Sequence, residues 1–114
     1  MFLGNKKLDE NLTFSVNTHS ATTGAATDAD SAPSYRVYED ETTTPLLTGT
    51  MALLDDANTT GLYSEQIALT SANGFETGKS YTINISAVVS AVTGTTSHHF
   101  EIEAAGAGQR GWGF

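Results

Sequence analysis

The sequence predicts an all-β fold built as an antiparallel sandwich of two sheets. Apolar and polar residues alternate with period two through most of the chain, which is typical of strands that bury one face. Turn-forming residues interrupt the alternation at short intervals, and no window has the spacing of an amphipathic helix. Threonine is abundant, and its branched β-carbon suits strands. With 114 residues, the chain has the size of one domain with one hydrophobic core.

Three strands are expected in the first half of the domain, within residues 12–16, 35–38 and 47–53. A polar stretch rich in Thr, Ser and Ala separates the first two, and a turn that ends at Pro45 separates the second from the third. Residues of one parity in each strand are expected to face the core: Leu12, Phe14 and Val16, then Tyr35 and Val37, then Leu47, Met51 and Leu53.

Three further strands are expected within residues 63–69, 81–87 and 96–102, so that the sandwich has six to seven strands in all. Glu65 has the parity of an expected core face and interrupts it. The segment at 81–87 alternates most regularly, and a turn is predicted after it at Thr93-Gly94. The expected core-facing residues are Tyr63, Ile67 and Leu69, then Tyr81, Ile83, Ile85 and Ala87, then Thr96, His98, Phe100 and Ile102.

Composition divides the chain into three zones. Residues 1–9 are expected to form an N-terminal arm, residues 10–103 the folded domain, and residues 104–114 a C-terminal arm. The C-terminal zone is rich in glycine, which predicts a flexible segment that cannot pack by itself.

Aromatic residues in this C-terminal arm predict a docking role. Trp112 and Phe114 would be costly to leave exposed, since each can bury a large apolar area. Aromatic side chains are also favoured at protein interfaces. We therefore expect Trp112 and Phe114 to bind a neighbouring subunit, with Phe2 and Leu3 in the same role at the other terminus.

The charge balance disfavours nucleic acid and anionic membrane surfaces as partners. The net charge is −8, and the five Lys and Arg residues are scattered, whereas nucleic-acid binding draws on clustered cations. No apolar stretch approaches the roughly 20 residues of a membrane span. The first residues also place lysines after the apolar ones, the reverse of a secretory signal, so synthesis in the cytoplasm is expected.

No complete phosphate-binding or EF-hand motif is present. In SANGFETGKS, three residues separate Gly74 from Gly78, whereas a P-loop needs four, and a strand follows where a helix is required. Asp28 and Asp30 lack the spacing of an EF-hand loop, although a calcium site built from several acidic loops stays open. There is no cysteine, so a thiolate metal site is excluded.

Histidine and serine patterns do not favour catalysis. His98 and His99 are adjacent on an expected strand and point to opposite faces, so we expect one at the rim of the core and the other on the surface. Without cysteine, a zinc site would need His19 as well as both of these, or carboxylates brought in by the fold, and no Gly-x-Ser-x-Gly elbow is present. We therefore expect no enzymatic activity and no cofactor.

A late segment carries a resemblance to a known fold family, through the residues GFETGKSYTINISAVVSAVTG. It resembles the later strands of immunoglobulin-like and fibronectin type III domains, where a tyrosine after a glycine turn forms a corner by bonding back to upstream backbone. Tyr81, shortly after Gly78, matches that tyrosine. The resemblance implies an Ig-like antiparallel β-sandwich; the paired cysteines of antibody domains are absent.

A wider segment, residues 35–87, resembles small structural proteins of tailed bacteriophage virions. That resemblance implies a virion protein of the capsid surface or the tail, made in the host cytoplasm. The first expectation is a capsid decoration or cement protein that binds the major capsid protein, as a homo-oligomer in which a trimer is possible. A tail or baseplate component is the close alternative.

A carbohydrate- or host-surface-binding module is the alternative from another class. Four aromatic residues could stack on sugars: Tyr35, Tyr38, Tyr63 and Trp112. Tyr35 and Tyr63 have core parity, whereas Tyr38 is expected to point outward, so sugar binding would depend on Tyr38.

Overall fold

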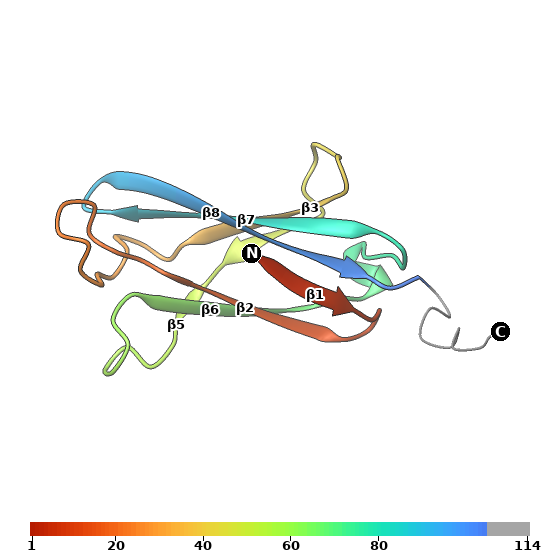
Figure 1. Cartoon of the computed structure of the whole chain (residues 1–114), viewed down its shortest axis with the longest axis horizontal. Helices are drawn as coiled ribbons and strands as arrows, with labels where there is room; N and C mark the ends of the chain where they lie inside the picture. Colours follow the sequence, from red (N-terminus) through yellow and green to blue (C-terminus); the bar gives the residue numbers. More distant parts are fainter. Residues whose placement is uncertain (105–114) are drawn as a thin grey trace.

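The computed structural model describes residues 1–104, which form eight strands and one short 3-10 helix (Figure 1). The elements are β1 (Phe2–Lys6), β2 (Asn11–Asn17), β3 (Ser34–Glu39), β4 (Leu47–Thr50), β5 (Ala52–Leu53), β6 (Leu62–Ala68), η1 (Ser71–Asn73), β7 (Ser80–Val89) and β8 (Val92–Ile102).

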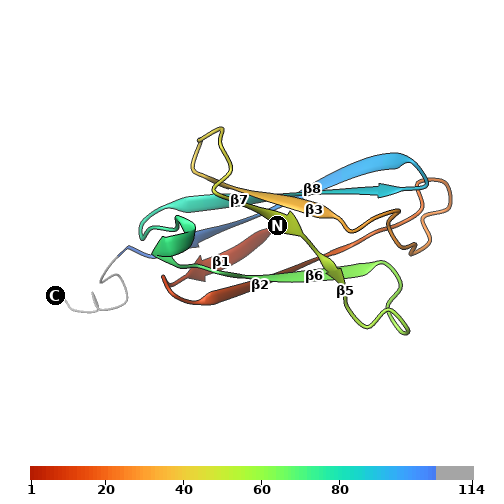
Figure 2. The ribbon, with the colours of Figure 1, turned by 180° about the vertical axis from the view of Figure 1, so that it is seen from behind.

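The strands form two sheets that lie face to face (Figures 1 and 2). One sheet has the order β1-β8-β7-β3-β4, and the other has the order β2-β6-β5. All pairings are antiparallel except that of β1 with β8, which is parallel. The prediction of an all-β fold with two sheets is confirmed.

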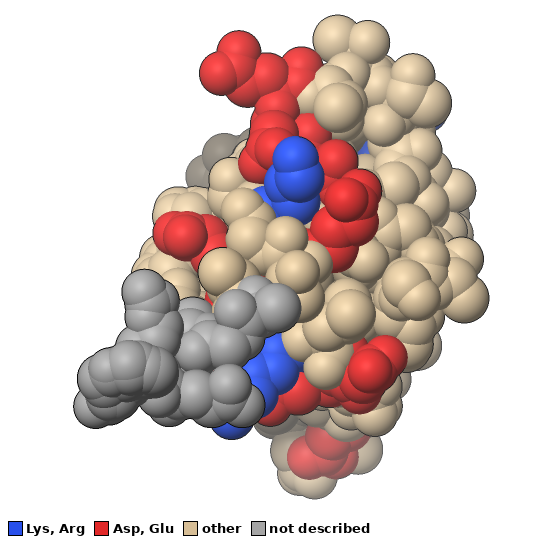
Figure 3. All heavy atoms as spheres, turned by 90° about the vertical axis from the view of Figure 1, so that its right-hand side faces the viewer, with Lys and Arg blue, Asp and Glu red and all other residues tan. Residues whose placement is uncertain are grey.

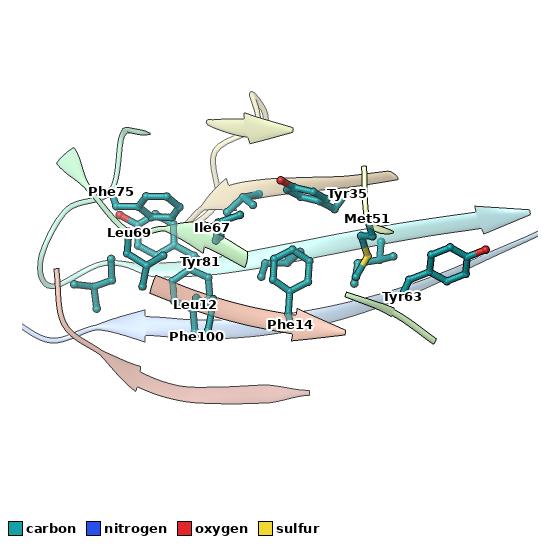
Figure 4. Packing of buried hydrophobic residues seen from close by; sticks show 14 residues of the cluster. Leu12, Phe14, Tyr35, Met51, Tyr63, Ile67, Leu69, Phe75, Tyr81 and Phe100 are labelled. Carbon is teal, nitrogen blue, oxygen red and sulfur yellow. The ribbon is translucent and has the colours of Figure 1, made fainter. Parts of the chain in front are cut away.

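The core lies between the sheets and consists of the residues that alternation assigned to it, with few exceptions. Figure 4 shows Leu69, Phe75 and Tyr81 near one end, with Phe14, Tyr35 and Tyr63 further along. The rings of Tyr81 and Phe100 stack with centroids 5.3 Å apart, and Phe75 meets Tyr81 edge-on at 5.0 Å. The buried cluster contains Leu12, Phe14, Tyr35, Val37, Met51, Tyr63, Ile67, Leu69, Phe75, Tyr81, Ile83, Ile85, Phe100 and Ile102.

The segment 47–53 departs from its prediction as a single strand. It divides into β4 in the first sheet and β5 in the second, and buried Met51 lies at the crossing. The Met51 N–H donates to the Pro33 carbonyl at 2.9 Å, which satisfies the backbone where the chain changes sheets. Leu53, predicted to be in the core, is 43% exposed because it follows this crossing.

Glu65 lies at its core-parity position because it has a partner in the facing sheet. Its carboxylate accepts a hydrogen bond from the Tyr35 hydroxyl at 3.0 Å. The pKa of Tyr35 is raised to about 12, mainly by burial and to a smaller extent by this contact with Glu65. A Cβ at Gly49 would lie 2.6 Å from the same hydroxyl, so glycine there makes room for the tyrosine ring.

The predicted tyrosine corner is present. The Tyr81 hydroxyl accepts a hydrogen bond from the Glu76 N–H at 2.8 Å and lies 3.0 Å from the Glu39 carboxylate, to which it donates. This contact connects the turn before β7 to the end of β3. Gly78 in that turn has φ +79°, and the segment forms a turn between strands, as the sequence predicts.

The N-terminal residues differ from the expected arm. Residues 2–6 form β1, which pairs with β8, and the Glu103 N–H donates to the Lys6 carbonyl at 2.9 Å. Leu3 packs against the core cluster. These residues become a strand because β8 offers them an unpaired backbone edge, a tertiary contact that local composition does not report.

Candidate protein-binding site

The part of β8 nearest its hairpin turn is left uncovered by the facing sheet. Val92, Gly94 and Thr96 have the inward parity of buried Phe100, yet all three are exposed. Val92 is 52% exposed and is one of the few large apolar residues on the surface of residues 1–104. The sandwich therefore opens on its inner side toward this end.

A groove occupies the opening, between the β7–β8 hairpin and the end of β2 with the residues that follow it. Its volume is about 250 Å³. Its lining is largely aliphatic, with threonines along the β8 wall. We call it the hairpin groove and define it by Val16, Ala87, Val89, Val92, Thr93 and Thr96.

An unpaired strand edge runs beside the hairpin groove. The Met1 amino group donates to the Ser97 carbonyl at 2.7 Å, and the His99 N–H donates to the Met1 carbonyl at 2.7 Å. Odd-numbered residues of β8 therefore direct their backbone groups toward the β1 side, whereas even-numbered ones face β7. By the same alternation, Thr93 and Thr95 point their N–H and C=O groups to that side, where no strand of residues 1–104 pairs with them.

The hairpin turn that borders the groove is held by Asp30. Its carboxylate accepts hydrogen bonds from the Ser90 and Ala91 N–H groups, both at 2.9 Å, and its own N–H donates to the Val88 carbonyl at 2.7 Å. Ser90 and Ala91 have φ values of 49° and 65°, as a two-residue hairpin turn requires. The N–H groups of Ala91 and Ser90 hold the pKa of Asp30 below its usual value.

The loop after β2, which lies opposite the hairpin, is hydrogen-bonded to the start of β6. The Gly61 N–H donates to the Asp28 carboxylate at 2.8 Å, and the Thr18 hydroxyl donates to the Thr27 carbonyl. Gly61 has φ +80°, and a Cβ there would lie 2.7 Å from the Thr18 carbonyl oxygen. Both walls of the groove are thus organised without a ligand.

The two adjacent histidines take the places predicted for them. His98 is half-buried, and its Nε2 lies 3.0 Å from the Ser15 carbonyl on the free side of β2, so it bridges the sheets. Its Nδ1 is buried without a hydrogen-bond partner in the described structure. His99 is exposed on the other face, where the Phe2 ring lies 5.1 Å from it.

The carboxylates of the acidic loops accept hydrogen bonds from backbone N–H groups and from side chains. Asp28 and Asp30 have the roles given above, and Asp55 accepts from the Asn58 side chain at 3.0 Å. Within residues 1–104, no cluster of three or more His, Asp or Glu side chains is placed to hold a metal ion. Figure 3 shows acidic side chains around a basic one at the opposite end of the domain, where Lys79 and Asp40 form an ion pair at 3.8 Å.

The four residues predicted to bind a partner have different positions. Trp112 and Phe114 lie outside the described residues. Phe2 is 49% exposed on the outer face of its sheet, where its ring lies 5.1 Å from that of His99. Leu3 packs on the core, so it contributes to the fold as well as to any contact.

The tyrosines considered for sugar stacking are largely committed to the fold. Tyr35 and Tyr63 are buried, and the Tyr63 hydroxyl accepts from the Ala29 N–H at 3.0 Å. Tyr38 is half-buried on the outer face of its sheet.

Comparison with known proteins leaves the sandwich without a family assignment. No family model matches the chain, and neither a curated protein nor a solved structure matches it. Among residues 1–104, no helix has the length and apolar character needed to cross a membrane.

Sequence reasoning did not find the hairpin groove. The available signal was the run AVVSAV, in which apolar residues continue on both sides of a two-residue turn. The turn was predicted later in the chain, at Thr93-Gly94, whereas it lies at Ser90-Ala91. The pair Ser90-Ala91 lacks the Asn or Gly typical of such turns, and Asp30 supplies the stabilisation instead.

Proposed function

We propose that this protein is a non-enzymatic structural protein of a bacteriophage virion, which decorates the capsid and stabilises the shell of the major capsid protein. The observation that carries its protein-binding role is the hairpin groove beside the unpaired edge of β8. The virion setting is supported by the resemblance of residues 35–87 to phage structural proteins.

We further assign the sandwich to the immunoglobulin-like class. The order β8-β7-β3 facing β2-β6-β5 is the order expected of the two sheets in that class. The corner made by the Tyr81 hydroxyl at the start of β7, and the parallel pairing of β1 with β8, support the same assignment.

The groove and the strand edge together suit a polypeptide partner. The groove volume of about 250 Å³ lies below the roughly 300–1,000 Å³ of small-molecule sites. An unpaired edge can accept an added strand, whose backbone supplies hydrogen bonds while alternate side chains fill a neighbouring groove. Natural sheets seldom leave such an edge uncovered, because it invites pairing with other chains.

The exposed apolar residues beside β8 would enlarge this contact. Val92, in the groove, is 52% exposed, and Met1, which reaches Ser97 of β8, is 75% exposed; Phe2, at 49%, lies on the outer face beside His99. Full burial of each large apolar side chain contributes about 1.5–3 kcal/mol. Repeated over the many sites of a shell, such contacts would hold neighbouring subunits together.

Co-sedimentation with particles tests this function. The purified chain is mixed with capsids assembled from the major capsid protein of the same genome, and bound protein is measured against concentration. We expect saturable binding that Val92→Asp weakens at least tenfold. Leu54→Asp is the matched control. Leu54 is 51% exposed, but it follows β5, which belongs to the other sheet. Absence of binding, or equal loss with both variants, would contradict the proposal.

A tail or baseplate location would use the same surface. The same measurement with purified tails distinguishes the two positions. Binding to tails but not to capsids would place the protein in the tail.

A further inference from the structure

We propose that the hairpin groove accepts residues 105–114 of a second copy of this chain, added as a strand along the free part of β8. This inference rests on the protein-binding role proposed above and names the partner. It makes the protein self-associating in a head-to-tail manner.

The free part of β8 has a defined extent. β1 covers the outer edge along residues 99–102, and the Met1 amino group reaches Ser97. Ahead of it, residues 92–96 would pair with an incoming strand over about 17 Å. Thr93 and Thr95 already direct backbone donors and acceptors to that side. The incoming strand would therefore continue the line of β1 toward the hairpin turn.

The groove selects side chains of one parity. A strand beside β8 in the same sheet alternates its side chains between the outer face and the groove. Trp112 and Phe114 are separated by one residue, so an extended segment directs both rings into the groove and Gly111 and Gly113 outward. Residues 105–114 contain no proline, so every backbone N–H can donate to a neighbouring strand.

A second copy fits this site better than the same chain does. β8 runs away from the groove and ends at Ile102. The chain therefore leaves the sandwich at the end opposite to the hairpin turn (Figure 1). A return along β8 is blocked at residues 99–102 by β1.

The contact is heterologous, because a tail on one copy meets a groove on the next. Such contacts produce rings when the rotation closes and open chains when it does not. Self-association would thereby bring the copies of a surface lattice into register with one another.

Complementation between two variants tests the pairing directly. Light scattering during size-exclusion chromatography would measure the mass of the full chain, of the double variant Trp112→Ala/Phe114→Ala and of the groove variant Val92→Asp. We expect the full chain to associate and each variant to be monomeric. An equimolar mixture should form a 1:1 heterodimer, because one variant has an intact groove and the other an intact tail. A monomeric full chain, or a mixture that stays monomeric, would overturn the inference.

Circular dichroism and thermal melting establish that each variant is folded. Should Val92→Asp unfold, Thr96→Lys blocks the groove from an exposed position on β8 and replaces it in the mixture. Its failure to disturb association would equally overturn the inference.

A peptide titration tests the parity requirement. Trp112 is the single tryptophan of the chain, so the full-length double variant Trp112→Ala/Phe114→Ala has none, and a 105–114 peptide reports its own binding to it by fluorescence. We expect a blue shift that saturates. In a control peptide, Trp112 and Gly113 are exchanged, which makes the aromatics adjacent and points them to opposite faces. We expect it to bind at least tenfold more weakly; equal binding by both peptides would contradict insertion as a strand.

These outcomes separate the self-association from the proposed function. Suppose that capsids bind the wild type but not Val92→Asp, while the full chain stays monomeric and does not bind the peptide. The self-association is then refuted and the capsid-binding role stands. If the copies associate but no particle binds, the virion function fails instead.

Discussion

The two halves of the β7–β8 hairpin have the same alternation but different neighbours. In the half far from the turn, Tyr81 and Phe100 lie opposite each other and are buried to 1% and 0% exposure. In the half near the turn, Val89 pairs with Val92 in the same register, and Val92 is 52% exposed. Alternation decides which face of a sheet a side chain occupies, whereas the facing sheet decides whether that face is buried.

The largest expected effect is a difference in the free energy of unfolding between variants at one residue from each half. Phe100→Ala should lower the free energy of unfolding by about 3–5 kcal/mol, because it leaves a cavity between Tyr81 and Phe75. Val92→Ala should change it by less than about 0.5 kcal/mol, as for a surface site. Urea unfolding measures both, and comparable losses would show that the hairpin tip belongs to the core.

A smaller loss is expected from the corner hydroxyl in the buried half. Tyr81→Phe should lower the free energy of unfolding by about 1–3 kcal/mol, because the Glu76 N–H loses its acceptor. Tyr38→Phe is the matched control, since Tyr38 lies outside the core cluster. Equal stability of Tyr81→Phe and wild type would mean that the corner does not stabilise the fold.

Acid should loosen the exposed half selectively. Because the folded-state pKa of Asp30 lies below its unfolded value of about 3.9, its contribution is complete above that pH and is lost as the pH falls through the folded-state value. Asp30→Asn should therefore be less stable at pH 7 and lose less on acidification than wild type. Melting temperatures from pH 7 to pH 2 measure the effect, with exposed Asp56→Asn as control. Parallel pH profiles for wild type and Asp30→Asn would contradict it.

The smallest effect is expected at the turn itself. Ala91 has φ +65°, which a side chain disfavours and glycine adopts freely. Ala91→Gly should raise the free energy of unfolding by a few tenths of a kcal/mol, up to about 1 kcal/mol. Urea unfolding checks it, and a loss of stability would mean that the methyl group has a contact that outweighs the backbone strain.

Part of the candidate site followed from sequence and part did not. His98 was expected at the rim of the core and lies at it, whereas the contact role expected of Phe2 stays a prediction for an exposed residue. The groove was missed because its residues are ordinary strand residues. Val92 and Thr96 have the same parity as Phe100, and they are exposed because the second sheet does not cover them.

The alternating pattern by itself determined the all-β class and the inward parity of most strands, and a resemblance of the segment around Tyr81 implied the corner there. These depend on local spacing, which the sequence contains in full. Tertiary structure alone decided that residues 2–6 form a strand on β8, that the chain changes sheets at Met51, and that the hairpin tip stays uncovered. Each of these depends on which strands become neighbours, and pairing between distant segments is set by the packing of the whole domain.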